Sequence, residues 1–234
     1  MILVTGASEG LGFACAAALL ERTPSEVLIT GRSEAKLRAA REGVPPAHRA
    51  RLAVLASDQS RRADVDGLAT LLAGPQADVE GAILTVGVNP VYSEGPRRLH
   101  TLCAATIEEI IRTNCTHALL LTTVLLKRLR QREGGALVWI GSQGAEAGLP
   151  GAGVYCATKS FLSGLARCAH HEYAGRGVRV HLAHPGLMRT PRTVAVADRF
   201  SVAHQVPVDD ANVVAHRIVD LFLGGDPSPV EVDL

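Results

Sequence analysis

The sequence is poor in aromatic residues and has almost no excess of charge of either sign. Phe, Trp and Tyr make up 3% of its 234 residues, and the formal net charge at pH 7 is +1. A chain so close to neutral lacks the broad basic surface of a nucleic-acid-binding protein, so we expect no nucleic-acid partner. Hydrophobic residues (47%) outnumber charged ones (20%), which predicts a folded chain with a substantial core.

Cysteine is scarce as well. The five cysteines are dispersed, odd in number and never spaced as Cys-x-x-Cys, which argues against a disulfide framework and favours a reducing cytoplasm. The adjacent His170 and His171 diverge around a helix and lack the spacing of a two-histidine metal face. We therefore expect no metal site.

Long hydrophobic runs are missing. No apolar stretch approaches the ~20 residues needed to span a bilayer. The first residues, MILVTGAS, carry no basic region ahead of their apolar run. The sequence therefore predicts neither secretion nor membrane insertion.

Short apolar runs alternate with longer helix-like stretches along almost the whole chain. The strand-like runs are 2–5, 27–30, 52–56, 81–86, 136–140, 178–183 and 229–234. Helices are expected at 11–21, 34–42, 60–73, 106–132, 154–173 and 208–223. Strands that are apolar on both faces and separated by helices are typical of a parallel sheet covered on both sides. We expect one α/β domain over residues 1–234, a doubly wound Rossmann fold with about seven parallel strands.

Glycines cluster directly after the first expected strand, in TGASEGLG (5–12). Gly6, Gly10 and Gly12 permit a tight turn and let the backbone approach a pyrophosphate, which the N-terminus of the next helix attracts. The motif alone is weak. Its place after the first strand of an alternating pattern is typical of a dinucleotide-binding loop.

The residues after the second strand, TGRS, bear on which dinucleotide binds. An acidic side chain here would accept hydrogen bonds from a ribose 2′-hydroxyl and repel a 2′-phosphate. Gly31 offers neither effect, whereas Arg32 supplies a fork of donors that suits a phosphate, so the sequence favours NADP(H). Two alternatives stay open: Glu9 in the glycine loop could oppose the phosphate, and Arg32 could be an ordinary solvated arginine.

The stretch GVYCATKS (153–160) unites two rare residue types, because the chain holds only three tyrosines and three lysines. Tyr155 and Lys159 are one helical turn apart and so share a helix face. A neighbouring ammonium favours the phenolate, so we expect Lys159 to lower the pKa of Tyr155 with help from the positive charge of a nicotinamide. Ser142 follows the strand 136–140 and could hold a substrate carbonyl, although a serine that merely ends a strand is an equal alternative.

Together these elements resemble the short-chain dehydrogenase/reductase family, and the likeness covers almost the entire chain in the family's order. Asn114, Ser142, Tyr155 and Lys159 match its catalytic tetrad. The resemblance implies that Tyr155 is the general acid–base and that Ser142 polarises the carbonyl. It also implies that Lys159 holds the nicotinamide ribose and that Asn114 supports a water in the proton relay. The segment HPGLMRTP resembles the nicotinamide-binding segment, and Asp58 occupies the place of the aspartate that meets adenine.

The same resemblance implies a set of cofactor contacts. They are Gly6, Ser8, Gly10, Leu11, Gly12, Arg32, Ser33, Asp58, Gln59, Gly87, Tyr155, Lys159, Pro185, Gly186, Met188 and Thr190. One stretch departs from the family: where many members have Asn-Asn-Ala-Gly, this chain has Leu84, Thr85, Val86 and Gly87. Gly87 keeps the close backbone approach and Thr85 keeps a hydroxyl, but the asparagine that usually supports the sheet is absent. The departure bears on the detail of the cofactor pocket.

The tetrad beside a cofactor loop predicts an NADPH-dependent carbonyl reductase that converts a ketone or aldehyde to an alcohol. Two alternatives remain. One is an NAD-dependent secondary-alcohol dehydrogenase, against which Gly31 and Arg32 speak. The other is a non-catalytic dinucleotide sensor or scaffold, against which the complete tetrad speaks.

The segment 187–207 is expected to lie over the crevice as a substrate loop. Its cationic side chains are Arg189, Arg192, Arg199 and His204. They could meet an acidic or carrier-bound substrate, so 3-oxoacyl thioesters on a carrier protein are the first choice; a mobile, solvated loop is the alternative. The run KRLRQR (127–132) could dock an acidic carrier, although cations near a helix C-terminus also complement its dipole.

The stretch ALLLTTVLL (118–126) is apolar at nearly every position, so a helix here needs cover on its outer face. In the resembled family this helix and the one bearing Tyr155 commonly form subunit contacts. We therefore expect a homodimer or homotetramer.

Overall fold

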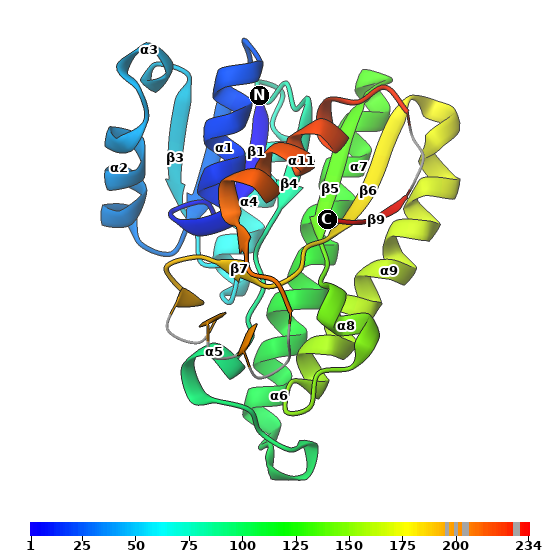
Figure 1. The fold of residues 1–234 in the computed structure, drawn as a ribbon. Coiled ribbons are helices and arrows are strands. Elements are labelled where there is room, and N and C mark those ends of the chain that lie inside the picture. Colours follow the sequence, from blue (N-terminus) through cyan, green and yellow to red (C-terminus); the bar gives the residue numbers. More distant parts are fainter. Residues whose placement is uncertain (195–196, 199–200, 203–205, 227–229) are drawn as a thin grey trace.

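Seven parallel strands form one sheet in the computed structural model (Figure 1), which describes residues 1–194, 197–198, 201–202, 206–226 and 230–234. In chain order the strands are β1 (Ile2–Thr5), β2 (Val27–Gly31), β3 (Leu52–Ala56), β4 (Gly81–Leu84), β5 (Gly135–Ile140), β6 (Val178–His184) and β9 (Glu231–Asp233). Their order across the sheet is β3-β2-β1-β4-β5-β6-β9, and every adjacent pair runs parallel. The expected doubly wound α/β fold is confirmed.

Helices cover both faces of this sheet. They are α1 (Gly10–Arg22), α2 (Glu34–Gly43), α3 (Pro46–Arg49), α4 (Arg62–Ala73), α5 (Val91–Glu94), η1 (Leu99–Thr101), α6 (Ala104–Ile111), α7 (Ala118–Arg132), α8 (Gln143–Ala147), α9 (Gly153–Tyr173), η3 (Ala174–Arg176) and α11 (Ala211–Leu223). Helices α1, α2 and α11 pack on one face, and α4, α7 and α9 pack on the other. In Figure 1, α11 crosses in front of the sheet and α7 lies behind it. Within the described ranges, no helix combines the length and the apolar character that crossing a membrane requires.

Strand β1 shows why the strand sequences are apolar on both faces. Leu3 belongs to the core under α4, α7 and α9, whereas Ile2 and Val4 belong to the core under α1 and α11. Successive side chains of a strand point to opposite faces, so a strand with helices on both sides needs an apolar residue at nearly every position. All four residues of β1 are buried accordingly.

The helix expected over 106–132 is interrupted. Helix α6 ends at Ile111, a π-helical turn, η2, runs over Arg112–His117, and α7 begins at Ala118. A π-turn widens the helix locally and is frequent at functional sites. The buried residues of this turn are Thr113, Asn114, Cys115 and His117.

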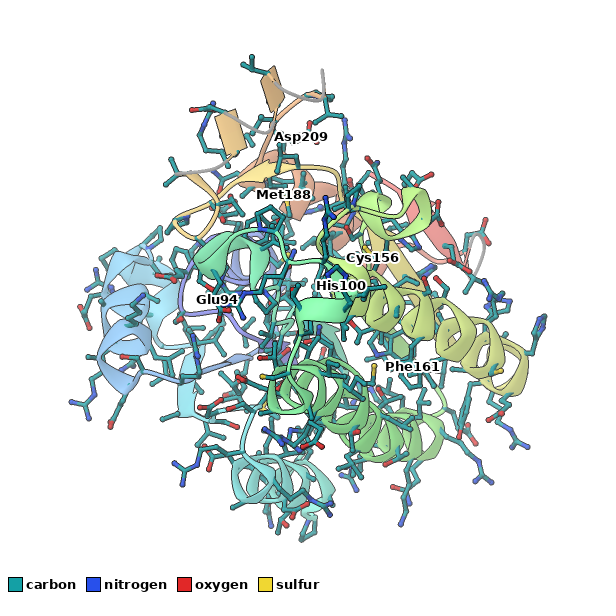
Figure 2. The ribbon with its side chains drawn as sticks, turned by 90° about the horizontal axis from the view of Figure 1, so that it is seen from below. Glu94, His100, Cys156, Phe161, Met188 and Asp209 are labelled. Carbon is teal, nitrogen blue, oxygen red and sulfur yellow. The ribbon has the colours of Figure 1, made fainter. Side chains whose placement is uncertain are left out.

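The carboxyl ends of the parallel strands share one edge of the sheet, the lower edge in Figure 1. The strand order reverses between β1 and β4, and open parallel sheets bind ligands in the crevice at such a point. Two short strands, β7 (Met188–Arg189) and β8 (Asp209–Asp210), pair beside this edge; their length gives no periodic signal in the sequence. In Figure 2, Met188 and Asp209 lie together on one side, and Cys156 marks α9 on the other.

Candidate active site and cofactor cleft

The turn between β1 and α1 is built around glycines. Gly6 and Gly10 adopt positive φ angles of 63° and 62°, a region that other residues rarely occupy. A Cβ atom at Gly12 would lie 2.6 Å from the Gly6 carbonyl oxygen, so only glycine fits there. Helix α1 begins at Gly10, and its N-cap residue Glu9 makes no side-chain capping bond. The first N–H groups of α1 are therefore available to an anion.

Thr85 fills part of the role of the missing asparagine. Its hydroxyl donates to the Thr5 carbonyl at 2.6 Å, and its N–H donates to the Thr5 hydroxyl at 3.1 Å. The same hydroxyl oxygen would lie 2.8 Å from a Cβ at Gly12. Thr85 thus ties the end of β4 to the end of β1 beneath the glycine turn, and the departure at residues 84–87 leaves the two strand ends joined.

The end of β2 is a tight corner beside the glycine turn. A Cβ at Gly31 would lie 3.2 Å from the Ser8 Cβ. Ser33 is the N-cap of α2, and its hydroxyl accepts the Lys36 N–H at 3.3 Å. Ser8 and Ser33 therefore lie beside the corner where a ribose would be bound.

Three charged side chains surround this corner. Arg32 is exposed. The Lys36 ammonium forms an ion pair with Glu9 at 2.8 Å. The acidic residue of the glycine turn thus faces a lysine that the sequence pattern did not single out, and Lys36 offsets the negative charge that would oppose a phosphate.

Asp58 and Gln59 follow β3. The Asp58 carboxylate accepts the Ser60 N–H at 2.9 Å, which fixes a tight turn. Gln59 is buried, and its Nε2 has no hydrogen-bond partner among the described residues. The backbone carbonyl oxygen of Gln59 lies 2.5 Å from Nδ1 of His117 in the π-helical turn. A buried donor without a partner is costly, so Gln59 has an unused bond to offer a ligand.

Tyr155 and Lys159 lie one turn apart on α9, next to the end of β5. The Lys159 ammonium is 5.6 Å from the centre of the Tyr155 ring and donates to the Ile140 carbonyl at 2.6 Å. Only 4% of the Lys159 surface is exposed. Ser142 follows β5 as the N-cap of α8, and its side chain hydrogen-bonds that of Tyr155.

Asn114 joins this group from the π-helical turn. Its Oδ1 accepts the Val88 N–H at 2.7 Å, and its Nδ2 donates to the Val88 carbonyl and to the Thr158 hydroxyl, both at 3.0 Å. A Cβ at Gly87 would lie 3.2 Å from Lys159 Nζ and 4.0 Å from Asn114 Oδ1. The structure therefore brings all four residues of the expected tetrad to one place, with the Gly87 backbone against them.

Burial governs the protonation of the two titrating residues. Burial raises the pKa of Tyr155 above its ordinary value of 10, the neighbouring Tyr92 adds to the rise, and the hydrogen bond from Ser142 opposes it. Burial lowers the pKa of Lys159 from 10.5 to about 8. The expected lowering of the Tyr155 pKa is wrong for the protein alone, because burial disfavours both the phenolate and the ammonium that was to stabilise it. Tyr155 is therefore a protonated acid at neutral pH.

The segment after β6 runs from the residues that follow β5 to the glycine turn. The Pro185 carbonyl accepts the Gln143 N–H at 3.2 Å, and a Cβ at Gly186 would lie 3.0 Å from Gln143 Oε1. Farther along, the Thr190 Cβ lies 3.5 Å from a Cβ placed at Gly10. The expected nicotinamide segment thus borders the same cleft as the glycine turn.

One arginine of the expected substrate loop contacts the cleft. Arg192 donates to the Gly87 carbonyl at 3.1 Å, and its charge is close enough to oppose the rise in the Tyr155 pKa. Arg189 instead forms an ion pair with Asp198 at 2.5 Å. The other two cationic residues of the loop, Arg199 and His204, lie outside the described residues.

The basic run at 127–132 lies away from the site. Helix α7 ends at Arg132, just before β5 begins, so the run is at the amino edge of the sheet, the upper end of α7 in Figure 1. Arg128 donates to the Ala77 carbonyl at 2.5 Å, and Arg132 pairs with Asp78. Arg128 and Arg132 thus contact the segment before β4, and both interpretations of the run, a docking site for an acidic carrier and cations that complement the helix C-terminus, stay predictions.

Comparison with known proteins agrees with this geometry. The family model described as short chain dehydrogenase matches residues 1–199. The chain belongs to the short chain dehydrogenase family. The resemblance drawn from the glycine turn and the tetrad is thereby confirmed.

Members of this family with quite different descriptions are similar to the chain. The very-long-chain 3-oxoacyl-CoA reductase of Mus musculus is 29% identical over 188 residues, which are 80% of this chain and 59% of that protein, less than two thirds of its length. The inactive 2-(S)-hydroxypropyl-CoM dehydrogenase 2 of Xanthobacter autotrophicus is 30% identical over 165 residues, 69% of this chain and 68% of that protein. Among solved structures, 3-ketoacyl-(acyl-carrier-protein) reductase from Brucella melitensis complexed with NADH matches with a TM-score of 0.86. At 19% identity, over 100% of this chain and 95% of that chain, the match supports the fold alone.

Proposed function

We propose that this dehydrogenase reduces a ketone or aldehyde to an alcohol with NADPH. The observation that carries the proposal is the meeting of Ser142, Tyr155 and Lys159 at the end of β5, together with a glycine turn that leads into the uncapped N-terminus of α1. A protonated phenol next to a second hydroxyl is suited to activate a carbonyl. Reduction by NADPH requires both parts of this arrangement, the proton donor and the binding site for the dinucleotide.

The residues of the cleft fit a nicotinamide dinucleotide. The uncapped N-terminus of α1 suits the pyrophosphate, and the unpaired Nε2 of buried Gln59 suits a nitrogen of the adenine ring. The residues proposed to border the nicotinamide end are Pro185, Gly186, Met188 and Thr190. When bound, NADPH supplies the hydride.

The protein's own residues handle the proton. Tyr155 donates its phenolic proton to the carbonyl oxygen as negative charge develops there, and Ser142 hydrogen-bonds the same oxygen. Tyr155 is protonated at neutral pH, as the proton donor of a reduction must be. Lys159, with a pKa of about 8, is suited to restore a proton to Tyr155 after each turnover. Asn114 fixes the backbone at Val88 beside this pair.

The side chains after β2 support NADPH as the cofactor. Arg32 and Lys36 provide two cations, and Gly31 provides no carboxylate to hold a free 2′-hydroxyl. The Brucella reductase with the same fold was solved with NADH, so the fold alone does not select the cofactor. The NAD-dependent alcohol dehydrogenase is the alternative within the same chemistry.

A 3-oxoacyl thioester, free or bound to a carrier protein, is the substrate that we propose. Two of the similar proteins are named for 3-oxoacyl or 3-ketoacyl substrates. The pocket beside Tyr155 is lined by apolar residues, among them Val91, Leu102, Ile110 and Val154, but its volume is only about 20 Å³. It has room for no more than the first carbon of an acyl chain, so a longer chain would need the lining residues to move apart.

We also propose a homodimer or homotetramer that covers α7 and α9. An apolar groove between these helices is lined by Leu99, Ile111, Leu119 and Phe161, whose exposed fractions range from 37% to 64%. Light scattering at micromolar concentration tests the assembly, and a monomer would contradict it. We place the protein in the cytoplasm, since dispersed cysteines fit a reducing compartment.

A second candidate is a non-catalytic dinucleotide-binding protein, favoured by the 30% identical relative that is described as inactive. Calorimetric titration with NADPH and NADH at matched salt, followed by turnover assays with acetoacetyl-CoA and small ketones, separates the two. We expect tight NADPH binding, weaker NADH binding and turnover. Preference for NADH would favour the alcohol dehydrogenase, and NADPH binding without turnover of any carbonyl compound would favour the non-catalytic protein. Binding of neither dinucleotide would refute both.

A further inference from the structure

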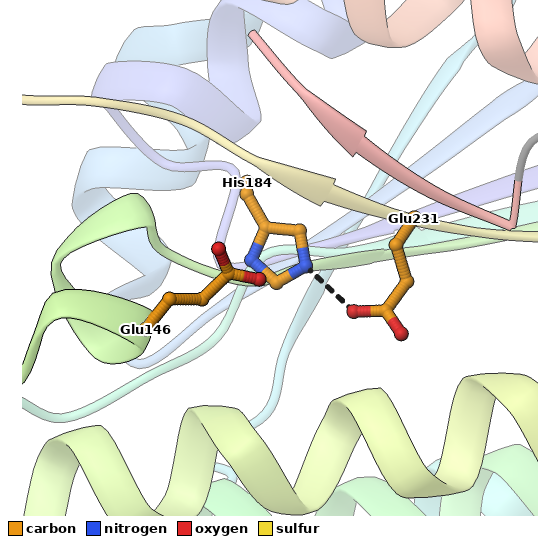
Figure 3. A group of neighbouring side chains, drawn as sticks. All are labelled: Glu146, His184 and Glu231. Atoms are coloured by element: carbon orange, nitrogen blue, oxygen red, sulfur yellow. Dashed lines mark hydrogen bonds and ion pairs between the residues drawn. The ribbon is translucent and has the colours of Figure 1, made fainter.

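A histidine outside the tetrad contacts the catalytic serine. His184, the last residue of β6, has 2% of its surface exposed. Its Nδ1 accepts the Ser142 N–H at 3.3 Å, and its Nε2 lies 3.1 Å from a carboxylate oxygen of Glu231 on β9 (Figure 3). Because Nδ1 is the acceptor, the neutral ring carries its proton on Nε2 and donates it to Glu231.

The end of β5 is shaped around this ring. A Cβ at Gly141 would lie 2.6 Å from His184 Nδ1, so glycine is required for the imidazole to approach the Ser142 backbone. On the far side, the Glu231 carboxylate is held by Arg167 of α9 at 2.5 Å. The chain of contacts runs from the outer strand β9 to the residue that would bind the substrate carbonyl.

Glu146 of α8 completes a group that resembles a metal site. The possible ligand atoms of Glu146, His184 and Glu231 lie within 4.8 Å of one another. A metal ion would need a ring nitrogen with a free lone pair. Here Nδ1 is taken by the Ser142 N–H, Nε2 faces Glu231, and Glu231 already pairs with Arg167. The contacts fit a hydrogen-bond relay better than a cation site.

We propose that His184 is a positioning residue for Ser142 and that the acceptor at its Nδ1 is required for full turnover. The inference rests on the proposed reductase function, in which Ser142 binds the carbonyl oxygen. A second proton, on Nδ1, would set two N–H groups against each other and push the Ser142 backbone away from Tyr155. The charged groups around the ring are Glu146 on α8, Glu231 and Asp233 on β9, and Arg167 on α9.

Two substitutions of His184 distinguish a role in positioning Ser142 from a role in filling the volume of the core. Asn can present an oxygen where Nδ1 lies, whereas Leu fills the volume without an acceptor. We expect His184→Leu to lower kcat about tenfold, the effect of one lost hydrogen bond at the reacting centre, with the Kd for NADPH unchanged. His184→Asn is expected to keep kcat within about threefold of wild type, a change worth less than one hydrogen bond. Equal loss in both variants, or none in His184→Leu, would overturn the proposal.

The matched control is His181→Asn, on the same strand but the opposite face, which should keep the wild-type kcat and the wild-type Kd for NADPH. A loss of kcat in this variant equal to that in His184→Leu would contradict the proposal.

Nuclear magnetic resonance tests the same contact without turnover and without a variant. In ¹⁵N-labelled wild-type protein, His184 should show the tautomer protonated at Nε2, with an Nδ1 signal shifted by the hydrogen bond from the Ser142 N–H. A proton on Nδ1 at neutral pH would overturn the inference even if the enzyme is active. The expected tautomer in a protein that turns over no carbonyl compound would instead count against the proposed function.

Discussion

The two ends of the cleft hold their charged groups in opposite ways. At the carbonyl end, the Lys159 ammonium is buried and bonded to a backbone carbonyl, and burial lowers its pKa. At the ribose end, Arg32 is exposed, and the side chains of the Lys36–Glu9 pair keep 59% and 41% of their surface exposed. Water and salt screen the exposed charges but not the buried one. We therefore expect changes at the carbonyl end to alter rate and stability strongly, and changes at the ribose end to alter cofactor choice modestly.

The largest effect should follow from Tyr155→Phe. The substitution removes the proton donor but keeps the ring, so kcat should fall about 10³-fold, the usual contribution of a positioned general acid. The Kd for NADPH should change less than twofold, because the hydroxyl serves the carbonyl and not the pyrophosphate. Steady-state kinetics and calorimetry on the same preparation measure both quantities. Tyr173→Phe, at the far end of the same helix, is the matched control; undiminished turnover in Tyr155→Phe would remove the basis for the comparison.

The second effect is on stability and follows from the buried lysine. The Lys159 pKa is about 8 in the folded protein, against 10.5 as its ordinary value. Between these pH values the unfolded chain binds a proton that the folded protein does not, so the free energy of unfolding should rise with pH. The full span is worth roughly 3 kcal/mol at 1.36 kcal/mol per pKa unit. Burial also raises the pKa of Cys15 from 9 to about 12, which acts in the opposite direction above pH 9, and the raised pKa of Tyr155 does the same above pH 10, so the measurement should not go beyond pH 9.

Urea denaturation of the cofactor-free protein at pH 7.5, 8.25 and 9.0 measures this rise. Lys159→Met should remove most of it, because methionine fills the same volume without a proton to lose. Lys127→Met, at an exposed position of α7, should leave the slope unchanged. A flat wild-type profile would show that Lys159 is better solvated than its burial indicates.

The sequence predicted the features that depend on which residues of a whole strand or helix are buried. Runs such as Leu3 and its neighbours are apolar on both faces because helices cover both sides, and that pattern specifies a parallel sheet. The tetrad positions were predicted because Tyr155 and Lys159 share a helix face at a fixed spacing. Whether those residues perform the assigned chemistry stays a prediction until turnover is measured.

The sequence alone could not predict contacts between segments that lie far apart along the chain. The π-helical turn that carries Asn114 reads RTNCTH, and no pattern in these residues distinguishes a π-helical turn from an α-helical one, so only the structure reveals the wider turn. His184 lies 42 positions from Ser142, and its bond to that residue depends on the spacing of β5 and β6. The prediction of a lowered Tyr155 pKa was wrong for the protein alone for the same reason, since the burial that raises this pKa is a property of the folded site.

The third effect lies at the ribose end and concerns the choice of cofactor. Arg32→Ala should weaken NADPH binding about tenfold while leaving NADH binding nearly unchanged, since a charge-assisted hydrogen bond to the 2′-phosphate contributes roughly 1.5 kcal/mol. Lys36→Ala should have a similar but smaller effect, because the ion pair with Glu9 neutralises part of the lysine charge. Calorimetry with both cofactors gives the ratio. Equal weakening of NADPH and NADH would mean that these cations contact something other than the 2′-phosphate.

The smallest effect should come from the carboxylate that shares the corner with these cations. Glu9→Gln removes the ion pair with Lys36 at constant size, so NADPH should bind about twofold more tightly at low salt, in keeping with the modest energy of exposed pairs. The gain should vanish near 1 M salt, where the Debye length of about 3 Å has shrunk to nearly the 2.8 Å of the contact itself. Glu21→Gln, at an exposed position near the other end of α1, is the matched control and should have no effect at either salt concentration. A gain that persists at high salt would show that Glu9 blocks the phosphate by its position, not by its charge, and the ribose end would then resemble the carbonyl end more closely than its exposure indicates.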